Sequence, residues 1–205
     1  NMVDIDEYIN YMAVEFYLGS DDWPQNNVKG FKPRVENGKF RFVLFDLDHS
    51  FNSSDAFNLF AGKRNYTFNY VTNSQNHAES KLVTIFLNML KNADFRKQFI
   101  DAYCLVAGSV FEPERCNAII DSMAANTERA LSYEGQSPWG TANTLKSQLK
   151  SRQQMMINTM KNYTSFRLSG VKEQKVSLMA NIPQARLRVN GLEVPTGKFN
   201  GSLFA

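Results

Sequence analysis

A turn-forming Asn-Gly pair between two strand-like runs most constrains how this chain can fold. Residues 28–34 and 39–45 both suit strands, and the segment between them carries Asn37-Gly38, a pair that favours a tight turn. In the second run, large apolar side chains alternate with a mixture of basic and apolar ones, which gives one strongly apolar face. That face consists of Phe40, Phe42 and Leu44. The sequence therefore predicts a β-hairpin.

Helical patterns lie on both sides of this hairpin. Residues 4–18 repeat apolar side chains at helical spacing, with Asp4 and Glu7 placed as in a capping box and Gly19 ending the pattern. Residues 20–27 lack an apolar period and predict a loop. Further apolar periods predict helices at 79–91, 94–110, 113–132 and 141 to about 166.

Two other stretches define the organisation of the chain. Residues 49–78 show no convincing period and predict a long loop, either functional or a flexible insertion, with aromatic residues that favour packing. From Val171 onward, short alternating runs and an Asn190-Gly191 turn predict the start of a small β module. We therefore expect an α+β fold with residues 1–170 as one unit, residues 171–205 as the next, and a boundary near Ser169-Gly170.

Composition limits the class of protein. The 205 residues are 43% hydrophobic, enough for a buried core, and 23 basic against 20 acidic residues give a net charge of +3. The basic residues are scattered, which argues against nucleic acid as the main partner. No apolar run approaches the length of a membrane span. The chain opens at Asn1 and stops inside a strand-like stretch, so we expect it to be a piece of a longer protein.

The chemistry of the sequence concentrates in the segments that flank the hairpin. Asp22 and Asn27 precede it, and Asp46 and Asp48 follow it. Phosphoryl transfer can use each of them, because one carboxylate must orient the acceptor hydroxyl while carboxylate and amide oxygens hold Mg²⁺. Protein kinases place their catalytic Asp five residues before the metal-binding Asn, the separation found here. The alternative is structural, because Asp and Asn are also common turn formers.

Other kinds of site find little support. His49 and His77 have no partner at metal-ligand spacing, which argues against a zinc enzyme. Cys104 and Cys116 are too few for a disulfide framework; free buried thiols and a single disulfide both stay open. The sequence also lacks a G-x-S-x-G elbow and a Gly-rich P-loop.

The ordered motifs resemble a known family. The pattern G-x-x-D-x-x-x-x-N from Gly19 to Asn27, followed by D-x-D-x-S-F from Asp46 to Phe51, is similar to the CotH family of spore-coat-type atypical kinases. The resemblance covers roughly residues 3–166 and includes Arg152 and Met156. Two features depart from it: Asn52 stands where the family usually has Gly, and a Lys-bearing N-terminal lobe is missing from the sequence.

The resemblance implies the C-lobe of a kinase-like fold that transfers phosphate from ATP to Ser or Thr of secreted or coat proteins. It implies Asp22 as the catalytic Asp, and Asn27, Asp46 and Asp48 as ligands of Mg²⁺ or Mn²⁺ and thereby of the nucleotide. It also implies an extracytoplasmic location. Without the N-terminal lobe of the same chain, we expect poor ATP binding. The competing hypothesis is a catalytically inactive CotH-like scaffold or surface-binding module.

Overall fold

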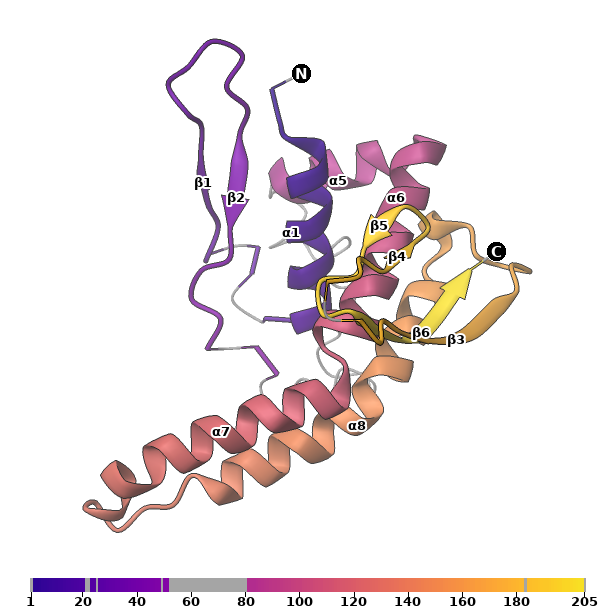
Figure 1. The fold of residues 1–205 in the computed structure, drawn as a ribbon. Helices are drawn as coiled ribbons and strands as arrows, with labels where there is room; N and C mark the ends of the chain where they lie inside the picture. The colour runs from indigo at the N-terminus through magenta and orange to yellow at the C-terminus, as the bar shows by residue number, and fades with distance from the viewer. Residues whose placement is uncertain are drawn as a thin grey trace.

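The computed structural model describes residues 2–20, 23–24, 26–48, 50–51, 81–182 and 184–204, and it is a mixture of helices and small antiparallel sheets (Figure 1). The described helices are α1 (Ile5–Leu18), α5 (Lys81–Met89), α6 (Ala93–Leu105), the π-helix η1 (Val106–Val110), α7 (Pro113–Ser132), α8 (Trp139–Asn162) and the 3₁₀-helix η2 (Thr164–Phe166). The described strands are β1 (Lys29–Phe31), β2 (Arg41–Val43), β3 (Glu173–Met179), β4 (Arg188–Val189), β5 (Leu192–Glu193) and β6 (Lys198–Phe204). This mixture is compatible with the α+β class expected from the sequence.

The first helix, α1, ends as predicted but begins differently. Gly19 adopts a left-handed conformation with φ of 63°, and its N–H donates to the Glu15 carbonyl, as expected for a glycine that ends a helix. At the other end, Asp4 makes no side-chain capping bond. Its carboxylate instead accepts from Arg41 of β2, with Oδ2 and Nη2 3.0 Å apart. A tertiary ion pair therefore replaces the predicted capping box.

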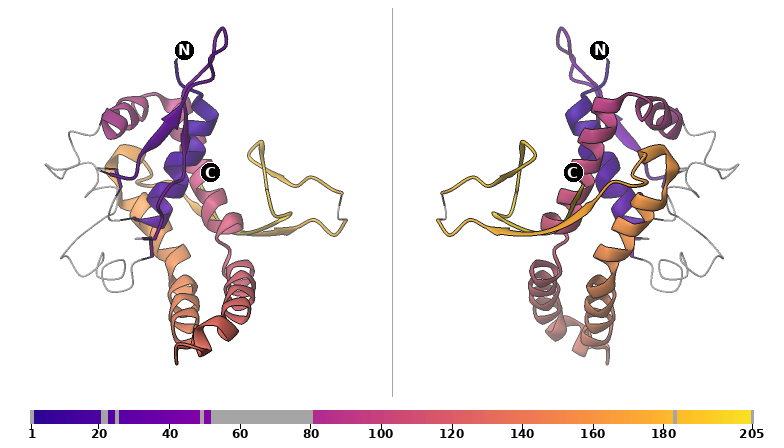
Figure 2. Two further views of the ribbon diagram at one scale, coloured as in Figure 1. Left: turned by 90° about the vertical axis from the view of Figure 1, so that its left-hand side faces the viewer. Right: turned by 90° about the vertical axis from the view of Figure 1, so that its right-hand side faces the viewer.

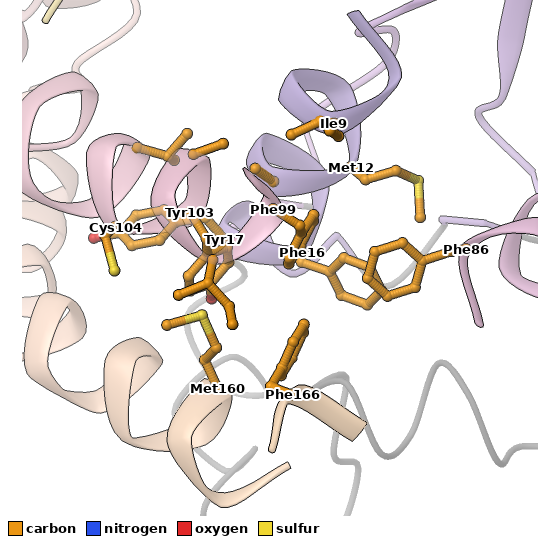
Figure 3. Packing of buried hydrophobic residues seen from close by; sticks show 14 of the residues in the cluster. Ile9, Met12, Phe16, Tyr17, Phe86, Phe99, Tyr103, Cys104, Met160 and Phe166 are labelled. Carbon is orange, nitrogen blue, oxygen red and sulfur yellow. The ribbon is translucent and has the colours of Figure 1, made fainter. Parts of the chain in front are cut away.

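The core forms where α1, α5, α6 and the end of α8 meet, and it is rich in aromatic side chains (Figure 3). Phe99 is fully buried at its centre. Its ring lies 4.8 Å from that of Phe86 and stacks on that of Phe166 at 5.5 Å between centroids. Phe16 adds a third neighbour, 6.2 Å away. These contacts fix the C-terminal half of α1, which leads into the predicted site.

The predicted hairpin is present, but its regular strands are short. Strand pairing runs only from Lys29↔Val43 to Phe31↔Arg41. Of the apolar face expected in the second strand, only Phe42 packs inward, stacking on Tyr11 of α1 at 5.3 Å. Phe40 and Leu44 stay 43% and 41% exposed. The hairpin extends past α1 (Figure 1), and Phe40, Arg41 and Phe42 join it to α1 and to the residues just before it.

The predicted helix over 94–110 divides into two parts. α6 ends at Leu105, and the next five residues form the π-helix η1. Strand β6 packs directly on this turn, as its contacts with η1 show. The strand that packs on this turn lies far along the chain, so local sequence cannot reveal the contact.

The remaining elements extend from the core (Figures 1 and 2). α7 and α8 lie side by side as a two-helix arm. β3 pairs with β6 and β4 with β5, both antiparallel, so the strands predicted after residue 170 are present. Among the described helices, none combines the length and apolar character that a membrane crossing requires. Most of the predicted loop 49–78 lies outside the described residues.

Candidate functional site

The exit of the hairpin carries two exposed carboxylates, those of Asp46 and Asp48. Asp46 has a left-handed backbone, with φ of 55°, a conformation that Asp and Asn tolerate better than most residues. Such backbone conformations concentrate at functional sites. After this reversal the chain continues into a turn, where the Ser50 N–H donates to the Leu47 carbonyl over 2.9 Å.

Asn27 lies just before β1, at the entry of the hairpin, and contacts the segment at its exit. The entry and the exit together form the open end, or mouth, of the hairpin. Its Nδ2 donates to the main-chain carbonyl of Asp46 over 3.2 Å. The register of β1 and β2 explains the meeting, because Lys29 pairs with Val43, two residues beyond Asn27 and three before Asp46. The structure thus brings Asn27 and Asp46 together, although they are 19 residues apart in sequence.

Asp22, the remaining predicted site residue, lies outside the described residues, so its distance to Asp46 stays a prediction. The next residue, Trp23, is firmly anchored. It is 2% exposed, its Nε1 donates to the Tyr11 hydroxyl over 2.8 Å, and its ring meets the edge of Phe16. Trp23 therefore ties one side of this loop to α1.

The donors at the hairpin mouth suit a hard divalent cation. Because the bond to Asp46 uses the Asn27 amide nitrogen, it does not occupy the Oδ1 atom. The carboxylates of Asp46 and Asp48 form no ion pair with another described residue. Mg²⁺ is held in proteins by one or two carboxylates together with substrate phosphates, so this oxygen set fits the ion. Within the described ranges, however, no group of three or more His, Cys, Asp or Glu side chains could hold a metal.

A residue to which sequence reasoning gave no role, Arg152 of α8, contacts both motif-bearing segments. Its side chain is fully buried, and its Nε and Nη2 donate to the carbonyls of Tyr17 and Leu18 over 3.1 and 2.8 Å. Its guanidinium carbon lies 4.6 Å from the centre of the Phe51 ring. A signal exists in the sequence: Arg152 sits between the buried Leu149 and Met156 on one helix face.

Glu15 is a residue that the sequence analysis did not single out. It lies on α1 one turn before the loop that contains Asp22, and it is 1% exposed. Burial raises the pKa of its carboxyl to about 7, against a smaller, opposite effect of the neighbouring Tyr11 hydroxyl. A change of pH near 7 therefore changes the charge of Glu15, one turn of α1 before the loop that contains Asp22.

Comparison with known proteins gives one match. A family model described as CotH kinase protein matches residues 1–171. Neither the curated proteins nor the solved structures contain a significant match.

Proposed function

Because the chain belongs to the CotH kinase protein family, we propose that residues 1–170 form the C-lobe of a kinase-like domain. In this proposal the β1–β2 hairpin and the helices that follow carry the phosphoryl-transfer groups, and residues 171–205 begin a C-terminal β-rich module. Family membership supports an atypical kinase-like protein. The contact between Asn27 and Asp46 is the observation that carries the assignment of the site.

Each residue of the site has a proposed role. Asp22 orients the acceptor hydroxyl of a Ser or Thr and accepts its proton. Asn27 and Asp46 hold Mg²⁺ or Mn²⁺ through oxygen atoms, and Asp48 is a further ligand or an orienting group. When bound, the cation neutralises charge on the phosphates of ATP. The hydrogen bond from Asn27 to the Asp46 main chain keeps these two residues close together.

The full-length protein is expected to supply more than this chain does. A Lys-bearing N-terminal lobe would hold the nucleotide phosphates, so residues 1–205 alone should bind ATP poorly. The proposed acceptors are Ser or Thr residues of secreted or coat proteins, outside the cytoplasm.

The first prediction tests Asp46 and Asp22 in the full-length protein with ATP and Mg²⁺ or Mn²⁺. Asp46→Ala should abolish metal-dependent nucleotide binding and turnover, because a metal ligand is lost. Asp22→Ala should preserve nucleotide binding and mainly lower kcat, by roughly a hundredfold or more. Binding is measured by calorimetry, and turnover by phosphate transfer to protein.

Two controls sharpen this test. Asp46→Gly also removes the carboxylate, but glycine adopts the left-handed backbone without strain, so a loss shared with Asp46→Ala belongs to the carboxylate. Glu36→Ala removes an exposed carboxylate from the far end of the same hairpin and should change neither quantity.

The outcomes separate the assignments. If metal-dependent nucleotide binding is undiminished in Asp46→Ala, Asp46 is not a metal ligand, and the role passes to Asp48 or is withdrawn. Full phosphorylation by Asp22→Ala would remove its catalytic role. An intact protein that binds no nucleotide would instead favour the scaffold function.

A further inference from the structure

Arg152 is a buried cation whose surroundings do not account for its charge. It is 0% exposed, and no ion pair links it to a carboxylate among the described residues. Its Nη1 is buried and has no hydrogen-bond partner within the part of the chain that the structure describes. Burying a charge without a counter-charge is costly, so an apolar residue would suit this core position better.

Its hydrogen bonds explain one half of its position. Tyr17 and Leu18 are the last two residues of α1, where main-chain carbonyls lack helical partners and the helix dipole is negative. The guanidinium donates to both carbonyls. Arg152 thus caps α1 from outside, just before the loop that contains Asp22 and Asn27.

Its stacking contact explains the other half. The guanidinium lies over the ring of Phe51, five residues after Asp46. Phe51 also donates its N–H to the Leu18 carbonyl, over 3.4 Å, and its ring meets the edge of Phe111 at 5.9 Å. Both the end of α1 and the end of the Asp46–Phe51 segment therefore rest on Arg152.

We propose that Arg152 is a positioning residue that fixes the Leu18–Asn27 segment and the Asp46–Phe51 segment relative to each other. It thereby sets the geometry between the acceptor-orienting and the metal-binding groups. This inference rests on the proposed function. Only a guanidinium meets the requirement, because a planar fork donates to two carbonyls while its face stacks on an aromatic ring. A lysine in its place keeps the charge but not this geometry.

The test uses the full-length protein and Arg152→Lys, with Lys146→Met as the matched control. Lys146 lies on the same helix and pairs with Asp121 in the two-helix arm, over 2.6 Å. In Arg152→Lys, amide hydrogen exchange should accelerate at least about tenfold in peptides covering 18–27 and 46–51 but not in those covering α6. The value of kcat should fall about 10- to 100-fold with a smaller change in KM for the acceptor, because misplacement of reacting groups lowers the rate. Lys146→Met should change neither.

A second variant approaches the contact from its other side. Phe51→Leu removes the aromatic face and keeps an apolar side chain, and it should accelerate exchange in the same two peptides. Phe51→Tyr retains an aromatic ring, so its amide exchange should match the wild-type rate. These variants decide the question if Arg152→Lys fails to fold.

The inference is overturned if Arg152→Lys accelerates exchange uniformly over the chain, or leaves both segments and kcat unchanged. If the wild-type protein binds no nucleotide, the proposed function fails. The exchange measurement still decides whether Arg152 fixes the two segments, because it requires no catalysis.

Discussion

At the scale of single residues, the environment of a side chain matters more than its type. Glu15 and Glu7 lie on the same helix, yet Glu7 is exposed and Glu15 is buried beside Tyr11. A buried carboxyl favours its neutral form, which is why the pKa of Glu15 is raised to about 7. Glu15 therefore links the stability of α1 to pH.

The sign of this link can be predicted. With a pKa of about 7 in the folded protein against an ordinary 4.5, the folded state holds the proton more tightly than the unfolded chain. Its contribution is present below about pH 4.5 and is lost as pH rises through 7. Relative to wild type, Glu15→Gln should gain up to about 3 kcal/mol in unfolding free energy between pH 5 and pH 8.

Urea unfolding of both proteins at the two pH values measures this difference. Glu7→Gln is the matched control and should follow wild type at both. A constant difference between Glu15→Gln and wild type would contradict the prediction.

The individual site residues differ in how far sequence could place them. Asn27, Asp46 and Asp48 flank a hairpin whose turn residues are readable, so local pairing is sufficient to bring the first two together. Arg152 contacts Tyr17 from 135 residues away, and no local pattern encodes that meeting. Its place on an apolar helix face was visible, but the partners were not.

At the scale of elements, most helices follow the apolar period, while their irregularities follow tertiary packing. The π-helix η1 is the main example, since strand β6 packs against it. A β-carbon on Gly108 would lie 2.6 Å from the Phe199 ring, and one on Gly201 would lie 3.0 Å from the Gly108 Cα. Two glycines therefore allow strand and helix to approach this closely, and neither could be assigned this role before the fold was known.

This contact yields a prediction about stability. Gly108→Ala should lower the unfolding free energy by about 1–3 kcal/mol, because the new methyl group overlaps a fully buried ring. Gly140→Ala, in the first turn of α8, meets nothing within 4 Å and should be neutral or stabilising by up to about 1 kcal/mol. Chemical denaturation of both variants checks the pair. Equal effects would show that β6 does not constrain η1.

At the scale of the whole molecule, the hairpin, the two-helix arm and the C-terminal strands all extend from one aromatic core (Figure 2). The C-terminal strands are also fastened to the helices. Lys198 forms an ion pair with Glu112 at 3.3 Å, and the hydroxyls of Ser109 and Thr196 are 2.6 Å apart. If the chain divides into two units near residue 170, the second unit is therefore held against the helices of the first by these contacts.

Limited proteolysis tests that division. Cleavage is expected near Ser169-Gly170, where the residues are exposed and Gly170 has φ of 79°. The two fragments should separate on a denaturing gel but co-elute in native gel filtration, because Phe199 is fully buried against the helices. Resistance to cleavage there would argue for an undivided unit.

The hydrogen bond from Asn27 ends on the main chain of Asp46, and every amino acid offers the same carbonyl. The hydrogen bond itself is therefore indifferent to the side chain at position 46, whereas the left-handed backbone there, with φ of 55°, favours Asp, Asn or Gly. A lineage can therefore exchange Asp46 for Asn or Gly and, under the proposed function, lose phosphoryl transfer, while it keeps the architecture of the hairpin. Active and inactive descendants of such an ancestor would share a shape, and only the identity of one side chain would tell them apart.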